Sequence, residues 1–560
     1  MWFGRYALPD FCPDSMMECP MECTRIPPAE MPHATPLYTR FLTDFPRVSQ
    51  FYAHPPNLSG ILQAARDIRL EESVRRAVVD VLSAQNKSFG GDANTFRNLE
   101  RLRDGAVAVV TGQQVGLFGG PAYSIYKALT AIHVARELTA KGTNAVSIFW
   151  LANEDHDLAE VDHCFFAKRG NLERFDLNPA GIADRRVGEI ELGQGVQEIA
   201  TRAAAMLEGP FAEEAARLLA ETYRQEETFG SSFAKLMTRI FDGRGLIFLD
   251  PMSTELHRLS APTMLRAVKE HEILARELIV RSAELERAGF HAQVKVAEHS
   301  TLVFRIVDGQ RAALRPANGG LAAGAWQGSI DEALRDLEQH PDKFSPSALL
   351  RPVIQDSVLP TVAYIGGPAE VAYHAQTSLV YGKLLAHAPA ILPRAAFTLV
   401  PAHVANLLKK YNLDALDVFA GRHLLRAKLE AEALPQTLSA RFEAGEKTIK
   451  DMLEGMREPL AKLDQTLIGA LDTVAEKMLF QFNALRAKAG RAEGFRTGVV
   501  NTHENEIANT LLPNGELQER SLAFLPFLAS EGTRLLDQLD GQIRIGTGEH
   551  CVLRLEPAMK

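Results

Sequence analysis

The sequence contains no run of about eighteen apolar residues, the least that a membrane-crossing helix needs. It also lacks an excess of basic residues, because 61 Lys and Arg against 70 Asp and Glu give a formal net charge of -9. Proteins that bind nucleic acids usually show the opposite imbalance. We therefore expect neither a membrane nor a nucleic acid among the partners of this chain.

Cysteine is scarce, with five residues in 560. So few cysteines in so long a chain do not form a disulfide framework, and the first thirty residues lack the order of a signal peptide. These features predict a reduced, cytoplasmic protein. Cys12, Cys19 and Cys23 could ligate a metal cluster, but no fourth ligand lies nearby and the spacing matches no common site. We interpret residues 1–33 as a disordered leader and assign no metal ligand.

The composition that remains is that of a globular protein, with 46% apolar and 23% charged residues. At ~150 residues per domain, the length predicts three or four units. Two short apolar runs, 106–110 and 146–152, are typical of buried parallel strands. A glycine-rich loop at 111–121 and a helical pattern at 123–140 lie between them, so we predict a βαβ unit.

Part of this loop is repeated later in the chain. Gly119 to Ala128 and Gly366 to Ala375 share the pattern Gly-Gly-Pro-Ala-x3-Tyr-x-Ala, and each follows an apolar run. In open parallel sheets, ligands bind at the carboxyl ends of strands, where the strand order reverses. We expect the two loops to flank one crevice. The alternative is two independent helix starts that use the same N-terminal chemistry.

The last third of the chain is largely helical. Apolar residues recur at helical spacing along 438–456 and 460–485, and Gly455 and Pro459 interrupt the pattern where the two stretches meet. We predict an antiparallel coiled-coil hairpin, with an ordinary helical domain as the alternative. We expect the chain to end in a β-hairpin that pairs 541–545 with 551–555.

These patterns predict an α/β protein with a Rossmann-like parallel-sheet core, insertions and a long helical coiled-coil domain. The expected units are the leader (1–33), an N-terminal helical part of the core (34–105), a first Rossmann half (106–165), connecting insertions (166–310), a second Rossmann half (311–400), the coiled-coil domain (401–499) and a closing segment (500–560).

The first glycine loop is a candidate anion site. A helix N-terminus carries unpaired N–H groups and a partial positive charge, and glycines allow a ligand to approach them closely. The loop is neither a G-x-G-x-x-G fingerprint nor a P-loop, and a purely structural turn is the alternative. The residues that we expect to bind nucleotide phosphate are Thr111, Gln113, Gln114, Gly116, Gly119 and Gly120.

A polar cluster directly follows the apolar run 146–152. In it, His156 is a candidate general base, and Glu154 and Asp157 are candidate catalytic partners. Together with His163 and Cys164, the cluster could instead bind a divalent metal, or its acids could simply cap a helix.

The second loop suggests a site for another substrate. Arg351 and Arg394 could each hold a carboxylate, although a structural salt bridge is an equally good interpretation of either. The residues that we expect to bind substrate are Arg351, Gln355, Gly366, Gly367, Glu370 and Arg394.

Five segments, taken together, resemble one known family in order and spacing. They are TGQQVGLFGGPAYSIYKA (111–128), FWLANEDHDLAEV (149–161), LRPVIQDSVLPTVAYIGGPAEVAY (350–373), ILPRAAFTL (391–399) and LLPNGELQER (511–520). The family is the bacillithiol-biosynthesis cysteine-adding enzymes (BshC), and the resemblance covers nearly the whole chain from about Pro36.

This resemblance implies a ligase that joins the carboxyl group of L-cysteine to the amine of glucosaminyl-malate in the last step of bacillithiol synthesis. It implies a Rossmann-like core similar to those of class I synthetases and nucleotidyltransferases, and a homodimer formed through the coiled coil. Because an amide forms from a carboxylate only through an activated acyl group, ATP is expected, through either an acyl-adenylate or an acyl-phosphate, the second of which would release ADP. Two alternatives are a cysteine-dependent ligase or transferase acting on another amine, and a non-catalytic scaffold for the pathway.

Overall fold

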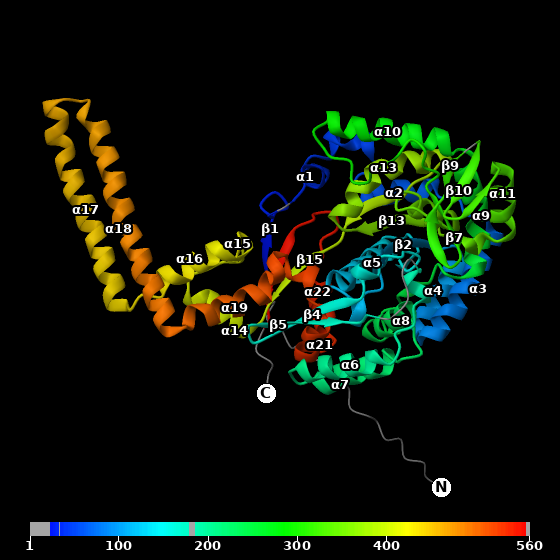
Figure 1. Cartoon of the computed structure of the whole chain (residues 1–560), viewed down its shortest axis with the longest axis horizontal. Coiled ribbons are helices and arrows are strands. Elements are labelled where there is room, and N and C mark those ends of the chain that lie inside the picture. The colour runs from blue at the N-terminus through cyan, green and yellow to red at the C-terminus, as the bar shows by residue number, and fades with distance from the viewer. Residues whose placement is uncertain (1–22, 33, 179–184, 318, 556–560) are drawn as a thin grey trace, which may run out of the picture.

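The computed structural model describes residues 23–32, 34–178, 185–317 and 319–555 (Figure 1). Its centre is a parallel sheet in the order β14-β13-β2-β3-β6. The strands are β2 (Val107–Gln113), β3 (Ala145–Leu151), β6 (Ile247–Leu249), β13 (Thr361–Gly366) and β14 (Ala390–Pro393). The predicted Rossmann-like core is therefore confirmed, with the apolar runs at the centre of the sheet.

Helices cover both faces of this sheet, which explains why its strands are apolar throughout. Ala108 and Val110 of β2 face a core shared with α3 (Glu72–Phe89) and α4 (Ala93–Arg103). Val109 faces the opposite side, against α2 (Leu58–Asp67) and α5 (Tyr123–Ala140). The remaining helices beside the sheet are α1 (Pro36–Thr43), α8 (Phe229–Ile240), α9 (Thr254–Lys269), α12 (Arg351–Val358) and α13 (Pro368–Leu384).

The strand order reverses between β2 and β13. From β2 the chain passes through α5 to β3 on one side, and from β13 it passes through α13 to β14 on the other. Thr111 of β2 pairs with Ile365 of β13, so the two strands end side by side. The two repeated loops thus start at the position where open sheets bind ligands.

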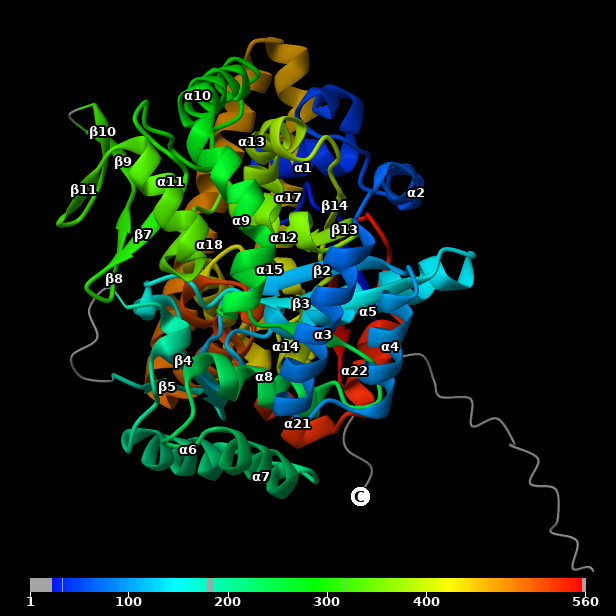
Figure 2. The same cartoon turned by 90° about the vertical axis from the view of Figure 1, so that its right-hand side faces the viewer.

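Two insertions extend this core. One contains the β4–β5 hairpin, α6 and α7, and the other contains two small antiparallel sheets with α10 and α11, set apart from the first in Figure 2. Their elements are β4 (His163–Lys168), β5 (Asn171–Asp176), α6 (Gly195–Met206), α7 (Ala212–Thr222), α10 (His271–Arg287), β7 (Val303–Val307), β8 (Gln310–Ala313), β9 (Arg315–Ala317), β10 (Gly320–Ala323), β11 (Trp326–Gly328), α11 (Ile330–Gln339) and β12 (Phe344–Pro346).

The predicted helical hairpin projects from the body as an arm (Figure 1). It consists of α17 (Gln436–Leu463) and α18 (Leu467–Thr497), which pack together through contacts such as that between the Phe442 and Phe482 rings. The predicted interruption near Pro459 was wrong, because α17 continues through this proline and the chain reverses only after Leu463. The other helices of this region are α14 (Ala402–Lys410), α15 (Ala415–Phe419), α16 (Arg422–Glu432), α19 (Val499–Leu511), α20 (Gln518–Ser521), α21 (Leu525–Glu531) and α22 (Arg534–Asp540).

The end of the chain differs from the prediction. Strand β16 (His550–Arg554) does not form a hairpin with 541–545. It lies between β15 (Ala396–Val400), to which it is parallel, and β1 (Cys23–Ile26), to which it is antiparallel. The local turn at Gly546 suggested a hairpin, but the ladder that forms joins segments far apart in sequence.

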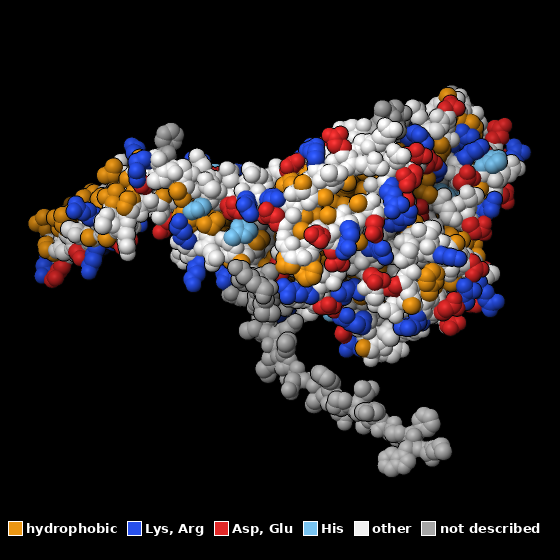
Figure 3. All heavy atoms as spheres, turned by 90° about the horizontal axis from the view of Figure 1, so that it is seen from below, with side chains coloured by type: hydrophobic (Ala, Val, Ile, Leu, Met, Phe, Trp, Pro, Cys, Tyr) orange, Lys and Arg blue, Asp and Glu red, His pale blue; other side chains and the backbone are white. Residues whose placement is uncertain are grey.

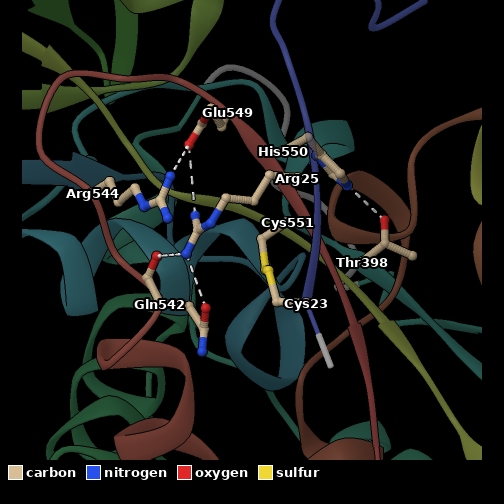
Figure 4. Close-up of a disulfide and its surroundings, with 8 residues drawn as sticks. All are labelled: Cys23, Arg25, Thr398, Gln542, Arg544, Glu549, His550 and Cys551. Carbon is tan, nitrogen blue, oxygen red and sulfur yellow. Dashed lines mark hydrogen bonds and ion pairs between the residues drawn. A yellow bond between two sulfur atoms is a disulfide. The ribbon is translucent and has the colours of Figure 1, made fainter. Parts of the chain in front are cut away.

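The cysteines also behave differently from the prediction. Cys23 forms a disulfide with Cys551, so it is not part of a disordered leader and the reduced state predicted for the chain does not hold for this pair (Figure 4). Arg25, on the same strand, donates to Gln542 and forms an ion pair with Glu549. Cys12 and Cys19 lie outside the described residues, and Cys164 is a buried free thiol.

None of the helices in the described part of the chain combines the length and apolarity that crossing a bilayer requires.

Candidate active site

A cavity of about 450 Å³ lies at the carboxyl ends of β2, β3 and β13. Its cationic lining residues are Lys127, Arg311, Arg351, Arg394 and Arg520. Its acidic lining residues are Glu154, Asp155, Glu160 and Glu370. Both repeated segments contribute side chains to it, so the expectation that they flank one crevice is met by the structure.

Lys127 and Glu370 form an ion pair across this crevice, and both side chains are largely withdrawn from solvent. Lys127 also donates to the carbonyl oxygen of Gly112 at 2.7 Å and to Gln113 Oε1 at 2.9 Å. It therefore ties the end of β2 to the start of α13. The sequence analysis did not identify Lys127, although the internal repeat aligns it with His374, also a buried basic side chain.

Glu370 is held as a carboxylate. Burial alone would raise its pKa, but the Lys127 ammonium, the Gly367 N–H and the Tyr364 hydroxyl all stabilise the negative charge and lower the pKa. Burial lowers the pKa of Lys127, against the opposing effect of Glu370. Glu370 therefore accepts three protein donors, and these contacts link α13 to α5 and β13.

Arg351 lies on the floor of the cavity, at the first position of α12. Its guanidinium donates to Gln355 Oε1 at 3.0 Å and to the hydroxyls of Tyr364 and Tyr373 at 3.2 Å each. Burial lowers its pKa, but the two tyrosines and Glu370 raise it by more, so the group stays charged. None of its described ion-pair or hydrogen-bond partners is a carboxylate, which leaves this cation suited to an anionic ligand.

The predicted phosphate loop is only partly in the cavity. Gln113 and Gln114 line it, whereas Gly116, Gly119 and Gly120 are buried behind it. The Gly119 N–H donates to the Tyr223 hydroxyl at 3.1 Å, and the N–H of Ala122, which precedes α5, donates to the carbonyl of Leu522. These N–H groups are occupied by the protein, so this helix start is not an open anion cradle.

Other predicted binding residues support the strands. The Thr111 hydroxyl donates to the carbonyl of Ile365 and so links β2 to β13. Gly366 ends β13, and the Gly367 N–H donates to Glu370 in the capping box of α13. Gln355 is fully buried and donates to Asp356.

The residues of the polar cluster after β3 do not all reach the cavity. Glu154 lines the cavity and its side chain is only 12% exposed. His156 points to Asp155 and Arg311, with its Nδ1 3.1 Å and 3.2 Å from Asp155 Oδ1 and Arg311 Nη1, and Asp157 is exposed. Of the three predicted catalytic residues, the structure thus brings only Glu154 to the cavity wall.

Arg394 forms a structural salt bridge, which was one of the two interpretations of this residue. Its guanidinium makes a bidentate ion pair with Glu519, at 2.7 Å and 2.8 Å, and the two side chains are 5% and 3% exposed. This pair connects the end of β14 to α20. Although Arg394 borders the cavity, its carboxylate partner is already in place.

The chemistry of the cavity is that of an anion site. Arg311, Arg351 and Arg520 come from three distant segments, and only the structure shows that they converge. Guanidinium groups bind carboxylates and phosphates well. In the described part of the chain, no group of three or more His, Cys, Asp or Glu side chains could hold a metal ion. The donors present therefore fit a nucleotide phosphate or a substrate carboxylate held by side chains.

Comparison with known proteins agrees with this architecture. Residues 21–395 match the family model for "Bacillithiol biosynthesis BshC, N-terminal Rossmann-like domain", and residues 397–555 match the model for its C-terminal coiled-coil domain. A protein of Koribacter versatilis named "Putative cysteine ligase BshC" is 40% identical over 95% of this chain and 99% of its own length. Proteins of the same name from Solibacter usitatus and Salinibacter ruber are 36% and 30% identical, over 95% and 94% of this chain and 100% and 98% of their own lengths.

Proposed function

Because this chain belongs to the BshC family of bacillithiol biosynthesis, we propose that it is a ligase that joins the carboxyl group of L-cysteine to the amine of glucosaminyl-malate, as the last step of the pathway. The observation that carries the proposal is the cation-lined cavity at the strand-order reversal, with Arg351 at its floor. Glucosaminyl-malate carries two carboxylates, and the half-buried Arg351 guanidinium, which forms no ion pair with a carboxylate of the described residues, matches one of them.

The cavity also offers neutral hydrogen-bonding groups. The side chains of Gln113 and Gln114 and the Tyr123 hydroxyl lie on the wall formed by β2 and α5. Amide and hydroxyl groups of this kind suit the hydroxyls of a sugar, whereas cations suit the malate carboxylates. Gln113, Gln114 and Tyr123 come from the first half of the Rossmann-like core, whereas Arg351 comes from the second.

We propose ATP as the co-substrate. When bound, it would supply the activated acyl group that amide formation from a carboxylate requires. Arg520, and Arg311 beside its partner Asp155, would hold its phosphates through side chains, since the N–H groups of Gly119 and Ala122 before α5 are occupied. A requirement for ATP also fits a cytoplasmic location, which we propose on that ground.

We further propose that the chain forms a homodimer through the arm. Apolar side chains are exposed along both helices of the arm and are visible in Figure 3. These residues are Leu438, Met452, Met456, Leu463, Val474, Met478, Phe480 and Leu485. A patch of this kind on a soluble surface usually marks an association site.

The proposal is tested with the purified full-length chain, L-cysteine, glucosaminyl-malate and ATP, with the amide product measured by mass spectrometry. Loss of the contacts of a charged donor costs about 1.5–3 kcal/mol, so Arg351→Met should raise the KM for glucosaminyl-malate roughly 10- to 100-fold. Arg335→Met removes an exposed arginine of α11 and should change nothing. No amide with glucosaminyl-malate, but amide with another amine, would show that the acceptor is wrong.

The corresponding test in the host is to delete and restore the gene. Bacillithiol should vanish and glucosaminyl-malate accumulate, and only an active chain should reverse both. If the Arg351→Met chain restores bacillithiol as well as the wild type does, while a chain without the arm does not, a scaffolding role is favoured over catalysis.

A further inference from the structure

Glu154 differs from the other acids of the cavity because its side chain is largely withdrawn from solvent and still has no hydrogen-bond donor among the described residues. Neither of its carboxyl oxygens accepts a hydrogen bond from any residue in the described ranges, although Oε1 is fully buried. His257 Nε2 on α9 lies 3.5 Å from Glu154 Oε1, and this buried nitrogen also has no hydrogen-bond partner among the described residues. Two facing polar groups thus lack hydrogen bonds, Glu154 at the cavity wall and His257 behind it, and leaving buried polar groups unpaired costs stability.

The other cavity acids are already engaged or solvated. Glu370 accepts from Lys127, Tyr364 and Gly367. Asp155 accepts from Arg311 and from the His156 N–H. Glu160 has an exposed side chain at the end of a short 3-10 turn. Glu154 therefore combines burial, access to the cavity and free acceptor capacity.

The surroundings of Glu154 favour proton exchange near neutral pH. Burial raises its pKa to about 7, with Asp250 acting in the same direction and Arg186, Arg311 and Arg351 opposing it. The facing His257 stays neutral, because burial and Arg186 lower its pKa to about 4. A neutral imidazole places no positive charge against the carboxylate. A group that gains and loses a proton near the working pH is suited to general acid–base catalysis.

We propose that Glu154 is the general base that removes a proton from the attacking amine, and that His257 is a positioning residue that fixes the Glu154 carboxyl group. The inference rests on the proposed function and deepens it. It also moves the role of base from His156, which is held by Asp155 and Arg311, to the buried acid two residues earlier.

The proposed step is a simple proton transfer. An ammonium group of the acceptor gives one proton to the Glu154 carboxylate, which becomes a neutral carboxylic acid, and the amine regains its lone pair. The amine nitrogen then forms a C–N bond to the acyl carbon that ATP has activated, and the bond from that carbon to the activating phosphate oxygen breaks. The proton that the nitrogen loses on becoming an amide leaves with the phosphate product.

The test compares Glu154→Gln with Glu338→Gln, a matched change in an exposed acid of α11 that lies outside the cavity. The first variant should lower kcat for amide formation roughly 10²- to 10⁴-fold with little change in KM, and the second should leave both constants near wild type. The acid limb of the wild-type pH profile, near pH 7, should disappear in Glu154→Gln. His257→Asn should shift that limb rather than remove it.

An assay with hydroxylamine as the acceptor distinguishes a Glu154 that acts as a base from a Glu154 that only maintains the structure of the site. It is unprotonated at neutral pH and needs no base, so Glu154→Gln should form the cysteinyl hydroxamate from cysteine and ATP within a few-fold of wild type. An equal loss of hydroxamate and amide formation would overturn the inference.

A titration without substrate keeps the inference testable if the proposed acceptor is wrong. The infrared difference between wild type and Glu154→Gln should contain one carboxylic-acid band that disappears with a midpoint near pH 7. If wild type shows this band but makes no amide with glucosaminyl-malate, the proposed function is wrong, while the assignment of Glu154 as a base that titrates near pH 7 stands. If the band is absent, the inference about Glu154 fails whatever the substrate.

Discussion

The Arg394–Glu519 pair offers a sharp test of whether a cavity arginine is structural. Both side chains are almost fully buried, and Glu519 Oε2 also accepts the N–H of Phe397 at 3.1 Å. Removing one member of such a pair leaves an uncompensated buried charge, which costs about 3–5 kcal/mol. Glu519→Gln and Arg394→Met should each lower the free energy of unfolding by this amount.

The double variant should lose much less than the sum of the two single losses. Glutamine at 519 keeps an acceptor for the Phe397 N–H, so removal of both charges leaves no unpaired ion. We expect a coupling energy of at least about 2 kcal/mol between the two changes, measured by urea unfolding of all four proteins. Near additivity would refute the reasoning.

The pH dependence of the same pair has a definite sign. Burial would raise the pKa of Glu519, but Arg394, His550 and the Phe397 N–H lower it below its usual value. A group with a depressed folded-state pKa contributes stability above its unfolded pKa, about 4.3 for Glu, and loses it as the pH falls through the folded value. Wild type should therefore lose stability below about pH 4 more steeply than Glu519→Gln. If Arg394→Met raises KM but leaves unfolding unchanged, Arg394 binds substrate instead.

Three further predictions concern other parts of the chain. Lys127→Met leaves the Glu370 carboxylate without its ion-pair partner. It should lower kcat/KM at least about 10-fold and the free energy of unfolding by about 3 kcal/mol. Adding Glu370→Gln should restore part of the lost stability. Cys23→Ser removes the bond to Cys551 and should lower stability by about 2–4 kcal/mol, matched by adding reductant to wild type; no response to reductant would contradict a stabilising role. Gly490→Ala places a Cβ 2.0 Å from a carbonyl oxygen of α16 and should cost about 1–3 kcal/mol in thermal unfolding, whereas Gly469→Ala, with open space around it, should stabilise α18 by up to about 1 kcal/mol.

The elements of the core could be predicted because their signals are local. The run 106–110 is apolar on both faces, which only a strand covered by two layers of helices requires. The arm was predictable because its apolar residues repeat at helical spacing over many turns. The repeated Gly-Gly-Pro-Ala pattern even indicated that two loops share one crevice, since both follow such strands.

The predictions made from short stretches of sequence were wrong where the structure depends on a partner far along the chain. A turn at Gly546 suggested a hairpin, but β16 pairs with β15 and with β1, which begins 527 residues earlier, at Cys23. The scarcity of cysteine predicted a reduced chain, but whether Cys23 and Cys551 pair depends on their distance in space, and the strand pairing places them together. Pro459 was taken as a helix break, yet α17 accommodates it.

The sequence by itself determined the α/β class, the Rossmann-like strands, the helical arm and the segments that carry the cavity, because period, apolarity and glycine placement act over a few residues. Only the tertiary structure decided which polar groups are free. It showed that Gly119 is bonded behind the cavity, that Arg394 already has Glu519, and that Lys127 crosses the crevice to Glu370. The physical reason is that the availability and pKa of a polar group depend on burial and on partners far along the chain. Glu154 and His156 are two residues apart in the sequence, yet the fold leaves one free at the cavity wall and binds the other to an arginine.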